Sequence, residues 1–186
     1  MTKEILELMS DIVNVRNYKE KDIPKETLEN MYEGFRCGPA SISTQARELV
    51  IIENKSSSQA LVEATLNPYL TKDSYGAQKW IIHAPFVSVV IIEMRRAIAR
   101  VGESGLSFAM QESEASIQNM RLIAKSEGLV TATIREFDGE KLKKNLNLPW
   151  YVIPVAIVTA GYPMEEESEN TPKLEMMEVV SKNRWT

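Results

Sequence analysis

The sequence predicts an α+β fold, because helical and strand patterns alternate irregularly along it and the strand patterns are few. Its 186 residues are 44% hydrophobic and 26% charged, proportions typical of a globular chain that buries a sizeable core. No internal repeat, low-complexity tract or long linker divides it. We therefore expect one domain over residues 1–186.

Apolar side chains at helical spacing predict two helices in the first forty residues. Thr2 can cap the first helix. Its apolar face consists of Ile5, Leu8, Met9 and Ile12. After a polar loop at residues 14–22, the second helix begins near Pro24, which suits a first turn, and Gly38 ends it. The hydroxyl-rich residues 39–45 then predict a loop.

The rest of the chain alternates strands and helices bounded by turn residues. Strands are expected over residues 48–53, 86–93, 129–134 and 152–160, and helices over residues 58–66, 78–83, 107–127 and 138–145. Residues 69–76 and 102–105 predict irregular connections. The tail regains an apolar pattern, which is unusual for a free chain end. We expect it to dock on a partner subunit.

Charge and composition exclude several classes of function. The net charge of −4 does not favour nucleic acid or a membrane surface as the main partner. One cysteine and one histidine exclude an intrachain disulfide and a multi-cysteine metal site. Neither a signal peptide nor an apolar run long enough to span a bilayer is present, so we expect a cytoplasmic protein.

Few residues by themselves indicate a catalytic or ligand-binding role. No glycine-rich nucleotide loop and no serine nucleophile motif occurs. We interpret His83 as a strand-end residue and Cys37 as a semi-buried small side chain. Arg16, in the polar turn, presents a planar donor fork suited to a phosphate, although by itself it is better explained as a solvated loop arginine.

Several short motifs follow one another in an order that resembles the nitroreductase family. They are residues 14–18 (Asn-Val-Arg-Asn-Tyr), 39–45 (Pro-Ala-Ser-Ile-Ser-Thr-Gln), 84–87 (Ala-Pro-Phe-Val), 116–124 and 161–163 (Gly-Tyr-Pro). The resemblance runs from about residue 5 to the end. It implies a nitroreductase-like fold, with a central mixed, mostly antiparallel sheet flanked by helices. It also implies an intertwined homodimer in which a tail of about residues 172–186 wraps the partner subunit.

The resemblance further implies FMN, bound in a cleft between the two subunits. Arg16 matches the basic residue beside the ribityl phosphate, and Asn14 replaces the motif serine. Gln78 matches an amide that bonds the pyrimidine edge of the flavin. Arg135 and Glu136 match the backbone amides that approach flavin N5.

The remaining implied contacts come from the loop and the tail. The loop that the partner offers to the flavin contains Pro39, Ala40, Ser41 and Ser43, and Lys173 matches a C-terminal basic residue near the phosphate. The implied activity is hydride transfer from NAD(P)H through FMN to nitroaromatics, quinones or similar acceptors. No side chain is expected to act as a catalytic acid or base.

Three departures from the family pattern keep alternatives open. Ile12 and Val13 stand where an arginine pair is usual, Glu136 stands where glycine is common, and the tail lacks the second basic residue. One alternative is a dimer of the same fold that has lost tight FMN binding and serves as a ligand-binding or interaction protein. Another keeps the flavin for different chemistry, such as reductive dehalogenation, although the short segment 69–76 leaves little room for a lid.

Overall fold

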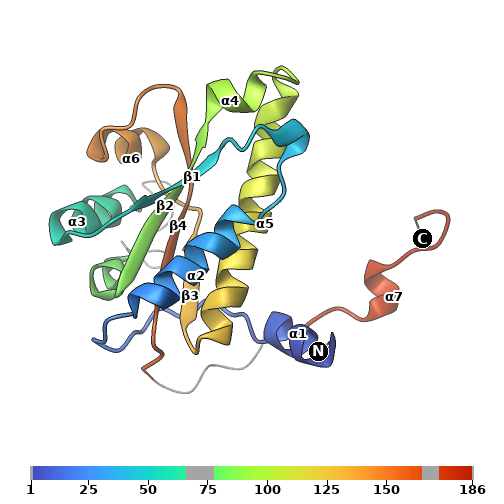
Figure 1. The fold of residues 1–186 in the computed structure, drawn as a ribbon, viewed down its shortest axis with the longest axis horizontal. Coiled ribbons are helices and arrows are strands. Elements are labelled where there is room, and N and C mark those ends of the chain that lie inside the picture. Colours follow the sequence, from blue (N-terminus) through green and yellow to red (C-terminus); the bar gives the residue numbers. More distant parts are fainter. Residues whose placement is uncertain (1, 66–77, 165–171, 186) are drawn as a thin grey trace, which may run out of the picture.

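Four strands form one sheet in the order β1-β2-β4-β3 (Figure 1). They are β1 (Arg47–Ile51), β2 (Phe86–Glu93), β3 (Val130–Ile134) and β4 (Val152–Gly161). The computed structural model describes residues 2–65, 78–164 and 172–185. All three ladders are antiparallel, and an isolated parallel bridge joins Asn14 to Thr131 of β3. The α+β prediction is confirmed, and every predicted strand is present within two residues of its expected ends.

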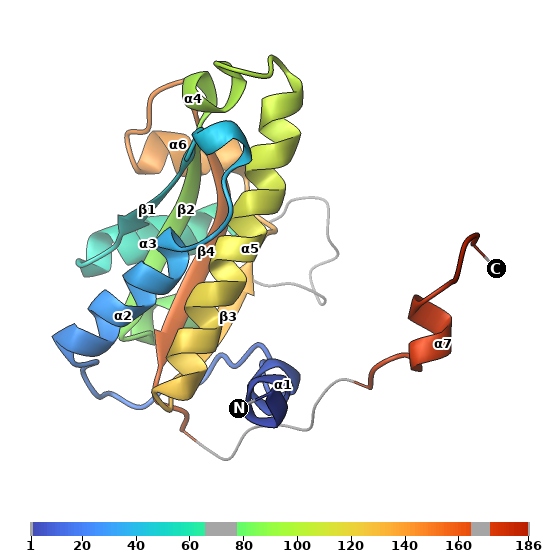
Figure 2. The same cartoon turned by 45° about the vertical axis from the view of Figure 1, so that its right-hand side comes forward.

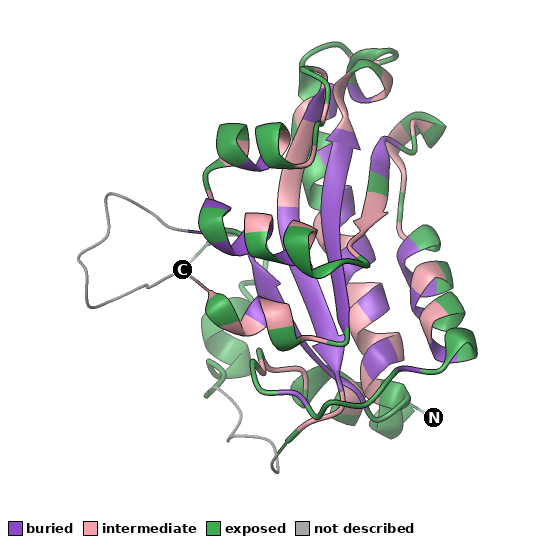
Figure 3. Ribbon diagram, turned by 90° about the vertical axis from the view of Figure 1, so that its left-hand side faces the viewer, coloured by how far each residue is buried: buried purple, intermediate pink, exposed green. Residues whose placement is uncertain are grey.

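Helices cover both faces of the sheet (Figure 1). On one face lie α2 (Lys25–Arg36) and α5 (Ser104–Ser126), and on the other lie α3 (Lys55–Ala64) and α6 (Gly139–Asn145). Successive strand residues point to opposite faces. Val90 and Val158 accordingly pack with α2 and α5, whereas Val89 and Ile157 pack with α3 and α6. Because both faces are covered, the two central strands are buried over most of their length (Figure 3).

The longest helix begins earlier than predicted. Residues 102–105 were expected to form a turn, but α5 starts at Ser104 and includes Gly105. A Cβ at Gly105 would collide with the carbonyl oxygen of Ala97, so glycine allows α5 to pack closely against α4 (Met94–Ile98). The prediction missed α4, because a five-residue helix is too short for helical periodicity to register.

Other helix ends depend on caps. The side chain of Asn54 accepts a hydrogen bond from the backbone N–H of Ser57, and α3 therefore begins at Lys55, three residues earlier than predicted. Thr2 was expected to cap α1 (Thr2–Ser10) but lies within it. The short helix before β2 is the 3-10 helix η2 (Lys79–His83). The predicted connection at residues 69–76 lies outside the described residues.

The C-terminal segment stands clear of the sheet and its helices. Figures 1 and 2 both show α7 (Met176–Val179) separated from this body. Large apolar side chains of the segment are exposed, and they are Leu174, Met176, Met177, Val179, Val180 and Trp185. The apolar pattern of the tail is therefore not buried within one chain.

Candidate functional site

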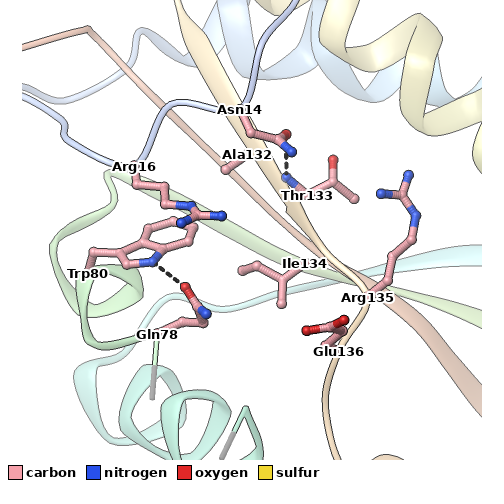
Figure 4. Close-up of a pocket in the computed structure, with 9 residues that line it drawn as sticks. All are labelled: Asn14, Arg16, Gln78, Trp80, Ala132, Thr133, Ile134, Arg135 and Glu136. Atoms are coloured by element: carbon pink, nitrogen blue, oxygen red, sulfur yellow. Dashed lines mark hydrogen bonds between the residues drawn. The ribbon is translucent and has the colours of Figure 1, made fainter. Parts of the chain in front are cut away.

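A cavity of about 200 Å³ lies where the N-terminal segment meets the end of β3 (Figure 4). Its lining residues are Asn14, Arg16, Gln78, Trp80, Ala132, Thr133, Ile134, Arg135 and Glu136. Three separate segments supply them: the turn after α1, the start of η2, and the end of β3 with the two residues that follow. We call this cavity the Asn14 pocket.

Hydrogen bonds to β3 and β4 hold the N-terminal turn in place. The Val15 N–H donates to the carbonyl oxygen of Thr131 at 3.0 Å. The buried Tyr18 hydroxyl lies 2.7 Å from the carbonyl oxygen of Val15 and 2.7 Å from the hydroxyl of Thr159. Burial raises the pKa of Tyr18 to about 12, although its hydrogen bond with Thr159 acts in the opposite direction. Asn14 and Arg16 therefore stand on a fixed backbone.

One wall of the pocket pairs Trp80 with Gln78. The indole Nε1–H of Trp80 donates to Oε1 of Gln78 at 2.7 Å (Figure 4). Since this bond occupies the amide oxygen, the Nε2 group of Gln78 is left to donate to a ligand. The sequence interpretation named Gln78 but missed Trp80, which follows it by two residues.

The opposite wall contains a buried hydroxyl that no described group satisfies. The Thr133 side chain is 8% exposed, and within the described part of the chain its Oγ1 has no hydrogen-bond partner. Buried polar atoms nearly always have partners, so an orphaned one beside a cavity favours a ligand there. No sequence pattern singled out Thr133, because alternation within a strand does not tell which of its residues line a cavity.

The two residues after β3 complete the pocket. The β3–β4 ladder ends with Ile134 opposite Ile157, so Arg135 and Glu136 follow the last paired position. The Arg135 guanidinium forms a two-pronged ion pair with Glu114 of α5, with Nε 2.8 Å from Oε1. The hydrogen bond to Glu114 raises the pKa of Arg135. This side chain is thus already paired, whereas the exposed Glu136 adds a negative charge to the pocket rim.

The loop at residues 39–45 lies on another side of α5. Buried Glu112 accepts a hydrogen bond from the N–H of Ser41, while Glu114 pairs with Arg135 of the pocket. Residues two apart on a helix point about 200° away from each other. The loop and the Asn14 pocket are therefore on opposite sides of α5 within one chain.

The conformation of this loop is strained. Its 3-10 turn η1 (Ser41–Ser43) and the following residues include three non-glycine residues in the left-handed region, Ile42 (φ 49°), Ser43 (φ 55°) and Gln45 (φ 45°). Each such conformation costs about 1–3 kcal/mol, and such residues cluster at functional sites.

The structure divides the ten predicted site residues into three groups. Those in the Asn14 pocket are Asn14, Arg16, Gln78, Arg135 and Glu136. Those on the loop, away from the pocket, are Pro39, Ala40, Ser41 and Ser43. Lys173 is exposed in the C-terminal segment and does not line the pocket.

Cys37 and His83 do not line the Asn14 pocket. Cys37 is exposed rather than semi-buried, because it follows the last turn of α2 at the surface. Its S–H donates to the Glu33 carboxylate at 3.3 Å, and this bond raises the pKa of the thiol. His83 is the exposed last residue of η2, which agrees with a strand-end role.

The described residues contain no group of three His, Cys, Asp or Glu residues that could hold a metal ion. None of their helices combines the length and the hydropathy needed to cross a membrane.

Comparisons with known proteins point in one direction. The sequence profile of the nitroreductase family matches residues 14–162. A "Putative NADH dehydrogenase/NAD(P)H nitroreductase" of Methanothermobacter thermautotrophicus is 23% identical over 87% of this chain and 78% of that protein. An "FMN reductase [NAD(P)H]" of Bacillus subtilis is 24% identical over 92% and 70%. The solved NADPH:FMN oxidoreductase of Vibrio harveyi superposes with a TM-score of 0.84 at 18% identity, covering 98% of this chain and 78% of that one.

Proposed function

The chain belongs to the nitroreductase family and is an NAD(P)H-dependent oxidoreductase, and on that premise we propose that it binds FMN in the Asn14 pocket. The observation that carries the proposal is the Thr133 hydroxyl, which has no partner among the described residues; Thr133 lines the pocket together with Asn14 and Gln78, within the part of the chain that the family profile matches. Nitroaromatics, quinones or similar acceptors would take the electrons.

The donors around the pocket fit a flavin. Gln78 retains an amide N–H for a carbonyl oxygen of the pyrimidine edge, and Arg16 is exposed at the rim with its charge available to a phosphate. Thr133 supplies a hydroxyl, and Ile134 an apolar surface. When bound, FMN would supply the hydride chemistry, while these residues orient it and exclude competing reactions.

The complete site requires a second subunit. The strained loop at residues 39–45 lies across α5 from the pocket of its own chain, so only another chain can bring such a loop to this pocket. The exposed apolar side chains of the tail support the same conclusion, since Met177 is 84% and Trp185 93% exposed. We therefore propose a homodimer in which the tail from about residue 172 wraps the partner.

A second candidate function rests on the small number of positive charges near the pocket. Glu136 places a carboxylate at the pocket rim, and Ile12 and Val13 lack the usual basic side chains. Losing a donor to a phosphate costs about 1.5–3 kcal/mol, or roughly a tenfold to hundredfold loss in affinity. The alternative is a dimer of the same fold that binds FMN weakly and serves as a ligand-binding protein.

A visible spectrum followed by FMN titration separates the two candidates. The reductase should be yellow as purified, or should bind added FMN and quench its fluorescence, and it should then oxidise NAD(P)H. A colourless protein that ignores added FMN would rule out the reductase. Arg16→Ala should weaken FMN retention, whereas Arg100→Ala, at an exposed arginine away from the pocket, should not.

A further inference from the structure

Arg121, in the C-terminal third of α5, brings a guanidinium to Asn14, one of the residues that line the Asn14 pocket. Its Nε donates to the Thr131 hydroxyl at 2.9 Å. Its Nη2 donates to the Val13 carbonyl oxygen at 3.1 Å and to the side-chain oxygen of Asn14 at 3.2 Å. Its contacts thus include Val13 itself, one of the two positions that lack a basic side chain.

The positive charge of Arg121 is not neutralised by these contacts. All three acceptors belong to neutral groups, and within the described residues no carboxylate forms an ion pair with it. Glu114 is nearby, but it is held by Arg135 in a two-pronged pair. Burial lowers the pKa of Arg121, and the like charge of Arg135 lowers it further. A partly buried cation of this kind favours an anionic ligand.

The same bonds leave donors free on Asn14 and on Arg121. The Asn14 oxygen accepts from both Arg121 and the N–H of Thr133, so its Nδ2 group is left to donate. Nε and Nη2 of Arg121 already donate hydrogen bonds, so its Nη1 group is left to donate to a ligand. Arg16 follows two residues after Asn14 and lines the same pocket. Asn14 and Arg16 thus line the pocket, and Arg121, which is not a lining residue, adds a second charged group in direct contact with Asn14.

We propose that Arg121 is a phosphate-binding residue, which holds the phosphate monoester of FMN together with Asn14 and Arg16 in place of the missing basic pair. This inference rests on the proposed function. Arg135 does not serve this purpose, because the Glu114 carboxylate accepts hydrogen bonds from its Nε and Nη2 and neutralises its charge. A planar fork suits a phosphate, which accepts paired charge-assisted hydrogen bonds.

The test compares FMN with riboflavin, which has the same ring and ribityl chain but no phosphate. Fluorescence titration should show that the parent protein prefers FMN. Arg121→Gln removes the charge and retains donors for Val13 and Thr131. It should weaken FMN binding by about tenfold to hundredfold and change riboflavin binding by less than about twofold. Arg121→Lys should restore part of the preference, and inorganic phosphate should compete with FMN but not with riboflavin.

Other outcomes overturn the assignment. Equal losses for FMN and riboflavin would mean that Arg121 only supports the backbone, and unchanged FMN binding would remove it from the site while leaving the proposed function intact. A parent protein that binds neither flavin would remove the proposed function and this inference together. Arg100→Gln controls for the change in net charge, and thermal melting checks that each variant is folded. If Arg121→Gln does not fold, two measurements on the parent and on Arg121→Lys replace it. They are the competition of inorganic phosphate with FMN and the salt dependence of the preference for FMN over riboflavin. The absence of both effects would contradict the proposal.

Discussion

The side-chain oxygen of Asn14 accepts a hydrogen bond from the backbone N–H of Thr133 at 3.2 Å, across 119 residues of sequence. This bond joins the turn after α1 to the end of β3, and the parallel bridge between Asn14 and Thr131 lies beside it. The shape of the pocket therefore depends on a long-range pairing that neither segment makes by itself.

Asn14→Leu should disrupt this junction. The variant keeps the branched shape of the side chain but leaves the N–H of Thr133 and one donor of Arg121 without an acceptor. We expect the free energy of unfolding to fall by about 1–3 kcal/mol, measured by urea denaturation. Asn14→Asp retains an acceptor and is the matched control. Unchanged stability of Asn14→Leu would show that the bond contributes little.

Tyr18→Phe should change how stability depends on alkaline pH. Burial raises the pKa of Tyr18 to about 12, whereas an unfolded tyrosine titrates near 10. The neutral hydroxyl therefore contributes stability that is fully present below about pH 10 and is lost as the pH rises to about 12. The parent should lose about 2–3 kcal/mol more than Tyr18→Phe over this range. Denaturation curves at a series of pH values measure the difference, and parallel losses in both proteins would contradict it.

Deleting residues 172–186 should weaken the proposed dimer. The exposed apolar side chains of this segment are not covered by the described residues of their own chain. We expect the dissociation constant to rise by at least about tenfold, measured by sedimentation velocity. Replacing Leu174, Met177 and Trp185 by serine should have a similar effect, whereas Lys182→Ser should not. A truncated protein that remains fully dimeric would show that the tail does not hold the interface.

Ser116→Ala should stabilise the protein. The Ser116 hydroxyl is buried on α5 without a hydrogen-bond partner among the described residues, so alanine removes an unsatisfied group. We expect a gain of about 1 kcal/mol in the free energy of unfolding. Ser113 is the matched control, since it is equally buried and its hydroxyl donates to the Ala109 carbonyl oxygen at 2.7 Å. Ser113→Ala should give no such gain, and equal effects at both positions would contradict the argument.

Strand positions could be predicted because their signal is local. Residues 86–93 are apolar except for Ser88 and Glu93, and the structure buries both faces of β2 with the bounds that the sequence indicates. The starts of α3 and α5 could not be predicted from helical periodicity. Asn54 acts through a cap and Gly105 through a close contact, and periodicity records neither. Cys37 was misjudged for a similar reason, because the apolar face of α2 ends before it.

The sequence by itself determined the α+β class, the four strands and the motifs that resemble the nitroreductase family. Only the tertiary structure decided which polar atoms meet. It brought Thr133 and Trp80 into the Asn14 pocket, placed the 39–45 loop across α5 from that pocket, and set Arg121 beside Val13. Local patterns fix an element because its neighbours are close in sequence, whereas a binding site is built from contacts between distant segments that only packing brings together.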